Sequence, residues 1–208
     1  IDTGSYPFIP PIDGIADSKN VYTSEGMLDL DTLPRRLVII GGGNIGMEFA
    51  SFYRNFGSEV TVLQDLPAFM PNEDDDIAAA VKDSLDAAGI KFEFGVSVTS
   101  VKDTEQGTKV FYTVNGEKRE TLGNAVLVST GRRPATASLN LAAAGVELTQ
   151  RGMIAVDEHM RTSAPGVWAI GDVAGSPQFT YISLDDSRIV LSDMTGGDRT
   201  AKGRNVPY

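Results

Sequence analysis

The chain has 208 residues, a formal net charge of −10, no cysteine and one histidine. This acidity argues against a nucleic-acid partner, because phosphate backbones are bound by basic surfaces. Without cysteine the chain holds no disulfide, no thiolate metal site and no redox pair, and no apolar run reaches the roughly 20 residues of a membrane helix.

The first segments predict little regular structure. Residues 1–20 are rich in proline and glycine, which excludes a helix or a central strand. They predict an extended segment that packs against other parts of the protein. A short helical turn is expected within 21–29, with Thr23 or Ser24 as its cap. Residues 30–34 then form a linker.

The next stretch carries the strongest signal. Residues 37–40 are apolar and predict a buried parallel strand, and Gly41, Gly43 and Gly46 follow with the spacing G-x-G-x-x-G. In this motif the first glycine makes a tight turn, the second lets the backbone approach a pyrophosphate, and the third lets helix and strand pack closely. The phosphates are expected on N–H groups at the positive end of the helix dipole.

The segments around the motif support this interpretation. Residues 47–56 predict a helix that Gly57 ends as a C-terminal cap, and residues 59–64 predict the second strand. Glycine clusters alone also mark ordinary turns. The strand, loop, helix and strand together therefore predict a dinucleotide site.

A second helix is expected over residues 73–88, with Asn72 as its cap. Its first four residues, 73–76, are all acidic. Carboxylates at a helix start are stabilised by the helix dipole, so we interpret them in this way rather than as a metal site. No metal site is predicted in the chain.

The pattern then changes from helical to antiparallel. Residues 91–94 predict a third strand. Residues 96–101 and 109–114 have the composition of strands, and the pair Asn-Gly at 115–116 is a strong two-residue hairpin signal, so an antiparallel meander is predicted here. Residues 125–129 predict a buried strand that returns to the parallel sheet.

Two further strands are predicted toward the end of the chain, at 152–157 and 166–172. The second delivers Gly171 and Asp172 to its carboxyl end, which is where ligands bind in open α/β sheets. His159 has no second histidine to pair with and is expected to be a surface side chain.

Four motifs, in this order, resemble those of the pyridine nucleotide-disulfide oxidoreductases, flavoproteins with two dinucleotide-binding domains. They are Thr-Gly-Ser at 3–5, Gly-Gly-Gly-Asn-Ile-Gly-Met-Glu at 41–48, Ser-Thr-Gly-Arg-Arg-Pro at 129–134 and Trp-Ala-Ile-Gly-Asp at 168–172. The stretch 179–190 and the ending 205–208 look like a mercuric-reductase-like bacterial branch, which includes enzymes linked to reactive chlorine and hypothiocyanous acid resistance.

The resemblance implies an α/β fold: a Rossmann-like parallel sheet with an antiparallel β-meander insertion, plus flanking pieces of an incomplete FAD domain. Residues 1–21 are expected in the first half of the FAD domain, 22–145 in the NAD(P)-binding domain, 146–190 in the second FAD segment and 191–208 in a connection toward a dimerisation domain. The family's redox cysteines are expected upstream and its catalytic histidine downstream. No catalytic residue is therefore expected in this chain.

The resemblance also implies which residues contact cofactors. The nicotinamide dinucleotide would contact Gly41, Gly43, Asn44, Ile45, Gly46, Glu48, Gln64, Val98 and Gly131. FAD would contact Thr3, Gly4, Ser5, Gly171 and Asp172. Among these, Glu48 and Gly131 would lie near the nicotinamide, Val98 at the adenine pocket, and Asp172 on the ribityl chain of FAD. Glu48 can also be interpreted as an ordinary helix glutamate.

Two residues depart from the family pattern. Gln64 stands where NADH-using members have a glutamate, whose carboxylate binds the ribose 2′-hydroxyl and repels a 2′-phosphate. No arginine lies in 64–76, and Asp65 and the acids at 73–76 make this stretch negative, so NAD(H) is favoured over NADP(H). Asn44 stands where many members have a tyrosine that covers the flavin, so that gating side chain is missing.

The sequence therefore predicts the NAD(P)H-binding portion of a bacterial, cytoplasmic flavoenzyme that passes hydride from NAD(P)H to FAD and on to a disulfide or related substrate. The parent is expected to be a homodimer without nucleic-acid or membrane partners, and the fragment alone is expected to be inactive. One alternative is an NADH-oxidase-like or ferredoxin-reductase-like flavoenzyme without a redox disulfide. Another is a non-catalytic NAD(H)-binding sensor module. The motif at 168–172 disfavours this alternative, because a stand-alone module does not need a second ligand-binding strand end.

Overall fold

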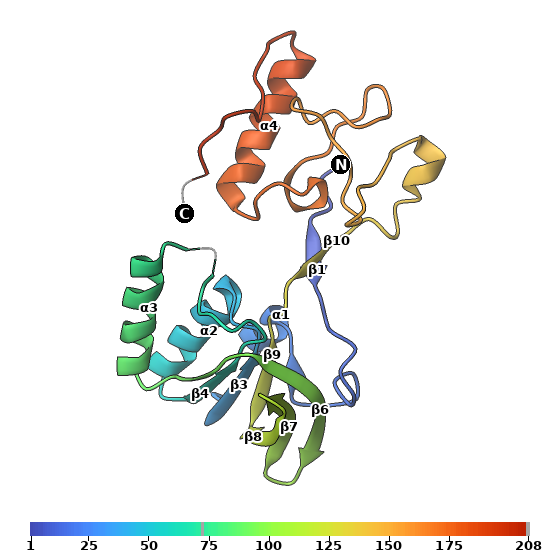
Figure 1. The fold of residues 1–208 in the computed structure, drawn as a ribbon. Coiled ribbons are helices and arrows are strands. Elements are labelled where there is room, and N and C mark those ends of the chain that lie inside the picture. Colours follow the sequence, from blue (N-terminus) through green and yellow to red (C-terminus); the bar gives the residue numbers. More distant parts are fainter. Residues whose placement is uncertain (72, 207–208) are drawn as a thin grey trace. The chain divides into compact units, whose positions relative to one another are not determined.

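Two units make up the chain in the computed structural model, which describes residues 1–71 and 73–206 (Figure 1). The middle unit is Pro7–Gly131, and the terminal unit combines Ile1–Tyr6 with Arg132–Tyr208. The boundaries of the cofactor domains, expected near residues 22 and 145, remain predictions.

Packing explains where these compact units begin and end. Residues 7–21 join the middle unit because Ile15 enters its core and the N–H of Val101 donates to the carbonyl oxygen of Asp13 at 2.8 Å. At the other boundary, Leu141 lies in the core of the terminal unit beside Val146.

The middle unit is built on a five-stranded sheet in which every neighbouring pair is parallel, in the order β2-β9-β3-β4-β5. The strands are β2 (Val21–Tyr22), β3 (Arg36–Ile40), β4 (Glu59–Leu63), β5 (Lys91–Glu93) and β9 (Ala125–Val128). This confirms the predicted parallel sheet and the return of residues 125–129 to it. The last of these strands in sequence lies between the first two.

Three helices accompany the sheet: α1 (Ser24–Leu28), α2 (Asn44–Asn55) and α3 (Asp75–Ala87). Thr23 holds the N-cap position of α1, although its side chain makes no capping bond. Gly57 follows α2 with a φ of +103°, as expected after a helix end. The predicted cap Asn72 lies outside the described residues, and α3 begins at Asp75 rather than at residue 73.

An antiparallel meander separates β5 from β9 in the chain. Its strands, in the order β6-β7-β8, are β6 (Val96–Thr104), β7 (Gly107–Val114) and β8 (Glu117–Gly123). Asn115 and Gly116 both have positive φ, 51° and 82°, which is the backbone of a tight two-residue hairpin turn. The predicted hairpin and meander are therefore confirmed.

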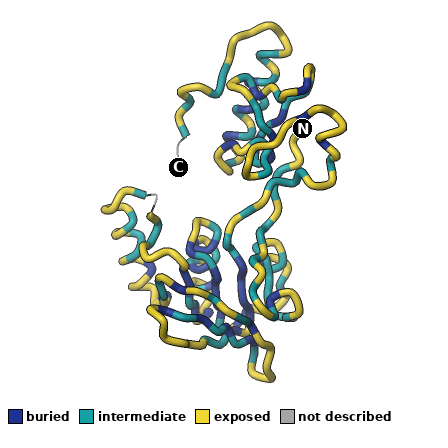
Figure 2. The backbone as a smooth tube through the Cα atoms, turned by 45° about the vertical axis from the view of Figure 1, so that its right-hand side comes forward, coloured by how far each residue is buried: buried dark blue, intermediate teal, exposed yellow. Residues whose placement is uncertain are grey.

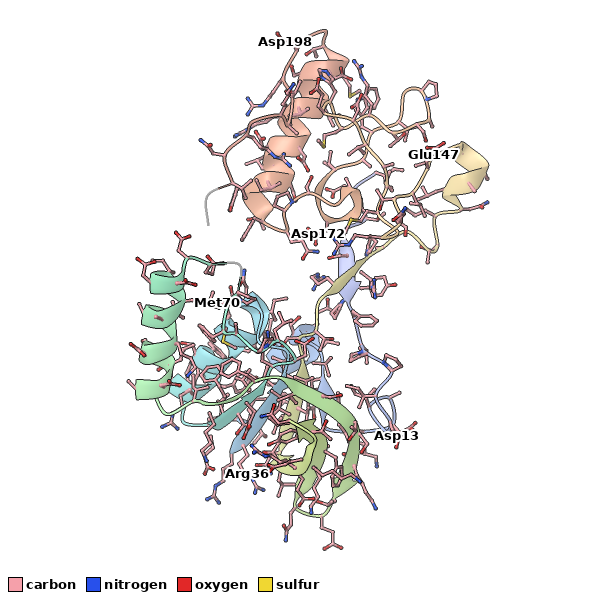
Figure 3. All side chains as sticks on the ribbon, viewed as in Figure 1. Asp13, Arg36, Met70, Glu147, Asp172 and Asp198 are labelled. Atoms are coloured by element: carbon pink, nitrogen blue, oxygen red, sulfur yellow. The ribbon has the colours of Figure 1, made fainter. Side chains whose placement is uncertain are left out.

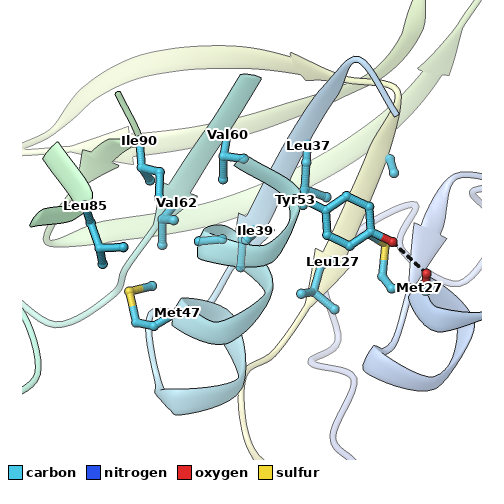
Figure 4. Packing of buried hydrophobic residues seen from close by; sticks show 12 residues of the cluster. Met27, Leu37, Ile39, Met47, Tyr53, Val60, Val62, Leu85, Ile90 and Leu127 are labelled. Atoms are coloured by element: carbon cyan, nitrogen blue, oxygen red, sulfur yellow. Dashed lines mark hydrogen bonds between the residues drawn. The ribbon is translucent and has the colours of Figure 1, made fainter. Parts of the chain in front are cut away.

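Alternate residues of the parallel strands face two different cores, so the sheet is buried on both sides. Leu37 and Ile39 of β3 belong to the cluster that contains Met47 and Tyr53 of α2 (Figure 4). Val38 and Ile40 of β3 instead join a cluster with apolar residues of the meander. Buried backbone is accordingly concentrated along these strands (Figure 2).

Tyr53 joins this core to α1 through a buried hydrogen bond, in which its hydroxyl donates to the carbonyl oxygen of Met27 at 2.7 Å. Burial raises the pKa of Tyr53. Replacing Tyr53 with phenylalanine keeps the ring but leaves that carbonyl without its donor, so we expect a loss of about 1–2 kcal/mol in unfolding free energy. Urea denaturation of both proteins measures this, and equal midpoints would show that water replaces the bond at no cost.

The terminal unit has less regular structure. It contains all but the last residue of β1 (Ser5–Pro7), which pairs with β10 (Arg132–Pro134), the 3₁₀ turns η1 (Leu141–Ala144) and η2 (Gly171–Ala174), and helix α4 (Thr180–Met194). The strands predicted at 152–157 and 166–172 are wrong. These segments form only the isolated bridges Leu148–Ile154 and Arg161–Trp168.

The reason is that each segment finds too short a partner to form a ladder. Trp168 and Ile170 exchange backbone hydrogen bonds with Ile1 alone, and Ala169 donates to the carbonyl of Met160. His159, expected at the surface, is half-buried, with its Nδ1 enclosed and without a hydrogen-bond partner. No helix among the described residues is long and apolar enough to cross a membrane.

Candidate functional site

The glycine loop follows the carboxyl end of β3, and two of its glycines are required by the protein itself. Gly41 has a φ of +106°, and a Cβ there would lie 2.5 Å from the carbonyl oxygen of Ser129. A Cβ on Gly46 would lie 2.2 Å from the carbonyl oxygen of Gly41. Neither position has room for a side chain, because backbone atoms cannot yield as side-chain ends do.

Gly43 is different. Its φ of −77° and ψ of −176° suit any residue, and a Cβ would meet no protein heavy atom within 4 Å. Neither the backbone conformation nor the surrounding protein therefore calls for glycine. The open space lies at the N-cap of the 12-residue helix α2, where unpaired N–H groups and the helix dipole favour an anion.

The amides of the first turn of α2 lie beside this space. The first intrahelical bond of α2 runs from the N–H of Met47 to the carbonyl oxygen of Gly43 at 3.0 Å. The N–H groups of Asn44, Ile45 and Gly46 precede that bond and belong to the set that has no intrahelical acceptor. This arrangement fits a diphosphate.

Two side chains hold the loop in place. The hydroxyl of Ser129 donates to the carbonyl oxygen of Gly41 at 2.8 Å, and the N–H of Gly42 donates to Oε1 of Gln64 at 2.7 Å. Sequence reasoning missed the positioning role of Ser129. The signal that could have indicated this role is that Ser129 is the first residue of the motif at 129–134.

The remaining nucleotide candidates lie in the same unit. Glu48 is exposed in the first half of α2, and Gly131, with a φ of +115° and open space around it, follows β9. Val98 is half-buried in the meander, beside an irregularity in the β6–β7 register, and packs against the second core. Gln64 directly follows β4 (Glu59–Leu63), so residues after three strands contribute to the carboxyl edge of the sheet.

The candidate FAD residues gather in the terminal unit around Asp172, which is labelled in Figure 3. The hydroxyl of Ser5 donates to Oδ2 of Asp172 at 2.5 Å. Arg132 donates from Nε to the Ser5 hydroxyl at 2.6 Å and lies 3.9 Å from the carboxylate of Asp172. Thr3 and Gly4 are both hydrogen-bonded to the backbone of Ala135.

Gly171, the neighbour of Asp172 in the chain, is held by a separate hydrogen bond. Its N–H donates at 2.9 Å to Oδ2 of Asp186, a side chain with no exposed surface. The contributions of Arg132 and Asp186 were missed from the sequence, because Arg132 and Ser5 are 127 positions apart. Proximity of this kind has no local signal.

Other features of the structure carry none of the predicted site residues. A cavity of about 580 Å³ lies at the amino ends of β3 and β9, with Arg36 and Asn124 in its wall. Within residues 1–71 and 73–206, no group of three or more histidine, aspartate or glutamate side chains could hold a metal ion.

Comparison with known proteins gives consistent matches. Residues 1–187 match the model of the pyridine nucleotide-disulphide oxidoreductase family. The chain is 44% identical over its whole length to the probable pyridine nucleotide-disulfide oxidoreductase RclA of Escherichia coli, of which it covers 47%. It is 36% identical to a mercuric reductase of Bacillus cereus, with 95% of the chain and 31% of the relative aligned.

Solved structures agree. The HOCl-induced flavoprotein disulfide reductase RclA from Escherichia coli superposes with a TM-score of 0.91 and 43% identity, over 99% of this chain and 47% of that one. A structure of LpdA from Mycobacterium tuberculosis gives a TM-score of 0.84 and 30% identity, over 95% of this chain and 42% of the other. The chain thus spans less than half the length of these relatives.

Proposed function

Because the chain belongs to the pyridine nucleotide-disulphide oxidoreductase family, whose members depend on FAD, we propose that it is the NAD(P)H-binding portion of a flavin-dependent oxidoreductase. Its middle unit is the nicotinamide dinucleotide domain, and its terminal unit is part of the FAD domain. When bound, the two cofactors supply hydride transfer from NAD(P)H to FAD and onward to a disulfide or related substrate.

One observation carries this proposal. Gly43 has space for a side chain within the protein and yet lies where a diphosphate would reach the amides of Asn44, Ile45 and Gly46. Anchoring the diphosphate there sets how far the nicotinamide extends from α2, with Glu48 and Gly131 toward that end and Val98 toward the adenine. The contribution of the chain is positioning, since hydride transfer requires close and oriented approach.

In the terminal unit, Asp172 is poised to accept a hydrogen bond from a hydroxyl group of the ribityl chain of FAD. Ser5 and Arg132 orient its carboxylate, while Asp186 fixes Gly171 beside it. Thr3 and Gly4 complete this edge of the FAD site. The chain has no cysteine, so its own residues supply no redox disulfide.

For the whole protein we propose a cytoplasmic homodimer that takes electrons from NADH in preference to NADPH and has no nucleic-acid or membrane partner. The acidic loop beside Gln64 supports the nucleotide preference. The relatives include a flavoprotein disulfide reductase, a mercuric reductase and a dihydrolipoyl dehydrogenase, which supports a disulfide or related group as the acceptor.

The chain alone tests this assignment. We expect it to bind NADH weakly and saturably, to keep no flavin through purification and not to oxidise NADH. Titration followed by the fluorescence of the reduced nicotinamide, together with a visible absorption spectrum, measures all three. A yellow, flavin-containing preparation that oxidises NADH would contradict the proposal that this chain holds only the NAD(P)H-binding portion of the enzyme. Absence of NADH binding would contradict the proposed coenzyme site.

A further inference from the structure

The cavity of about 580 Å³ in the middle unit lies at the amino ends of β3 and β9, whereas the glycine loop follows the carboxyl end of β3. One part of its wall is apolar and the other part is polar. The apolar part consists of Tyr22, Leu30, Leu33, Pro34 and Ala125, and the polar part of Asp31, Thr32, Arg35, Arg36 and Asn124. An apolar wall with a few polar groups, in a volume of this size, is typical of a site for a small organic molecule.

Arg36 lies in this wall, and two neutral groups hold its guanidinium in place (Figure 3). Its Nη2 donates to the carbonyl oxygen of Gln106 at 3.1 Å, and its Nε lies 3.5 Å from Oδ1 of Asn124. The same oxygen of Asn124 accepts the backbone N–H of Arg36 at 3.1 Å, and the N–H of Asn124 donates to the carbonyl oxygen of Arg36 at 2.7 Å. The guanidinium is therefore positioned in advance, which lowers the entropic cost of binding a ligand to it.

The positive charge of Arg36 has no negative partner among the described residues. No carboxylate of residues 1–71 or 73–206 forms an ion pair with it, and Nη1 meets no acceptor in these residues. The residue is half-buried, in a chain whose net charge is −10. A guanidinium in this state is best satisfied by an anion, because carboxylate and sulfonate oxygens accept N–H groups in strong, charge-assisted bonds.

The charges around the cavity favour a ligand of the same sign. Arg35 lies at the rim, with a side chain that is 85% exposed and 3.8 Å from Glu59. Lys91 lines a neighbouring hollow that shares Arg36 as a wall, and it forms no ion pair with a described carboxylate. Asp31 is an acid of the cavity wall, but it is exposed, so water and salt screen its repulsion.

We propose that this cavity binds a small organic anion, a carboxylate with an aliphatic or aromatic body. Its charged group pairs with Arg36, and its body lies against Leu30, Leu33 and Pro34. Because the glycine loop lies at the other end of the same parallel strands, the anion and the proposed coenzyme can be bound at the same time. The inference does not depend on the coenzyme assignment.

The test uses 8-anilinonaphthalene-1-sulfonate, an aromatic sulfonate that fluoresces strongly in apolar surroundings, titrated into the chain in the presence of saturating NADH. NADH keeps the dye out of the glycine loop. We expect saturable binding with a dissociation constant below about 0.1 mM, and displacement by hexanoate at a concentration about tenfold or more below that of the uncharged 1-hexanol. Absence of dye binding, or equal displacement by the two competitors, would overturn the proposal.

Arg36→Gln shows whether the guanidinium is the anchor, since glutamine removes the charge and keeps a side chain that can donate to Gln106. The dye affinity should fall about tenfold or more, and hexanoate should lose its advantage over 1-hexanol. Lys91→Gln is the matched control, because it removes one positive charge from the neighbouring hollow. Its effect should stay below about threefold and vanish at about 0.5 M salt.

Circular dichroism and urea denaturation of both variants check that each is folded. Unchanged dye affinity in Arg36→Gln would overturn the site, and equal effects of the two variants would replace it with a diffuse positive field. Loss of NADH binding in the wild type, with the response of the dye to Arg36→Gln retained, would refute the proposed coenzyme site and leave the anion site in place.

Discussion

Replacing Gly43 with alanine is expected to weaken NADH binding by about fivefold to a hundredfold while leaving the protein folded. The methyl group meets no protein atom within 4 Å but fills space that the diphosphate is proposed to occupy, and overpacking of this kind costs about 1–3 kcal/mol. Fluorescence titration measures the affinity, and urea denaturation should show a stability within about 1 kcal/mol of the wild type.

Gly46→Ala is the matched control, three residues along the same helix start. Its Cβ would lie 2.2 Å from the carbonyl oxygen of Gly41, so this variant is expected to lose about 1–3 kcal/mol of unfolding free energy or more. Wild-type NADH affinity in Gly43→Ala would show that the coenzyme does not approach this loop. Equal destabilisation of the two variants would assign Gly43 to the fold.

The second large effect is expected at Asp186. Its carboxylate has no exposed surface and accepts hydrogen bonds from the N–H of Gly171, the hydroxyl of Ser176 and the guanidinium of Arg204. Alanine at this position leaves the largely buried Arg204 with only the carboxylate of Asp185 at 3.6 Å, and leaves two polar groups without their acceptor. Losses of this kind typically cost about 3–5 kcal/mol. Urea denaturation followed by Trp168, the single tryptophan, reports on the terminal unit.

Asp185 provides the comparison, because it is adjacent and pairs with Arg199 at 2.5 Å; it also lies 3.6 Å from Arg204, which keeps its contact with Asp186 when Asp185 is replaced. Arg199 is well exposed, so Asp185→Ala is expected to cost about 1 kcal/mol or less. NADH affinity should be unchanged in both variants, since the proposed coenzyme site lies in the middle unit. Similar losses in the two variants would contradict the central role of Asp186, and lost NADH binding would contradict the independence of the coenzyme site.

The elements that sequence predicted best are those whose residues carry their own geometric signal. Gly57 marks the end of α2, and Asn115-Gly116 marks the hairpin, because each position has a positive φ that most residues avoid. The apolar runs of β3 and β9 predicted burial on both faces, which the two core clusters confirm.

What sequence could not predict depends on partners far along the chain. An apolar segment such as 166–172 becomes a strand only if neighbours of sufficient length pair with it. Here, among the described residues, its backbone-to-backbone bonds beyond the adjoining turns go only to the isolated residues Ile1, Met160 and Thr162. The unit boundary at Pro7 follows from contacts of Ile15 and Asp13 with the meander. Likewise, the interaction of Arg132 with Ser5 requires the fold to bring distant residues together, so it could be recognised only from the structure.

The position of β9 has a consequence for how the chain folds. This strand is made last among those of the sheet, yet β2 and β3 meet only through it. During synthesis, β3, β4 and β5 can pair as soon as they are made. β2 and the facing edge of β3 stay unpaired until the whole meander and then β9 have been synthesised. Closure of the sheet in the middle unit is therefore a late and cooperative event, and until it occurs the nascent chain exposes strand edges of the kind that chaperones protect.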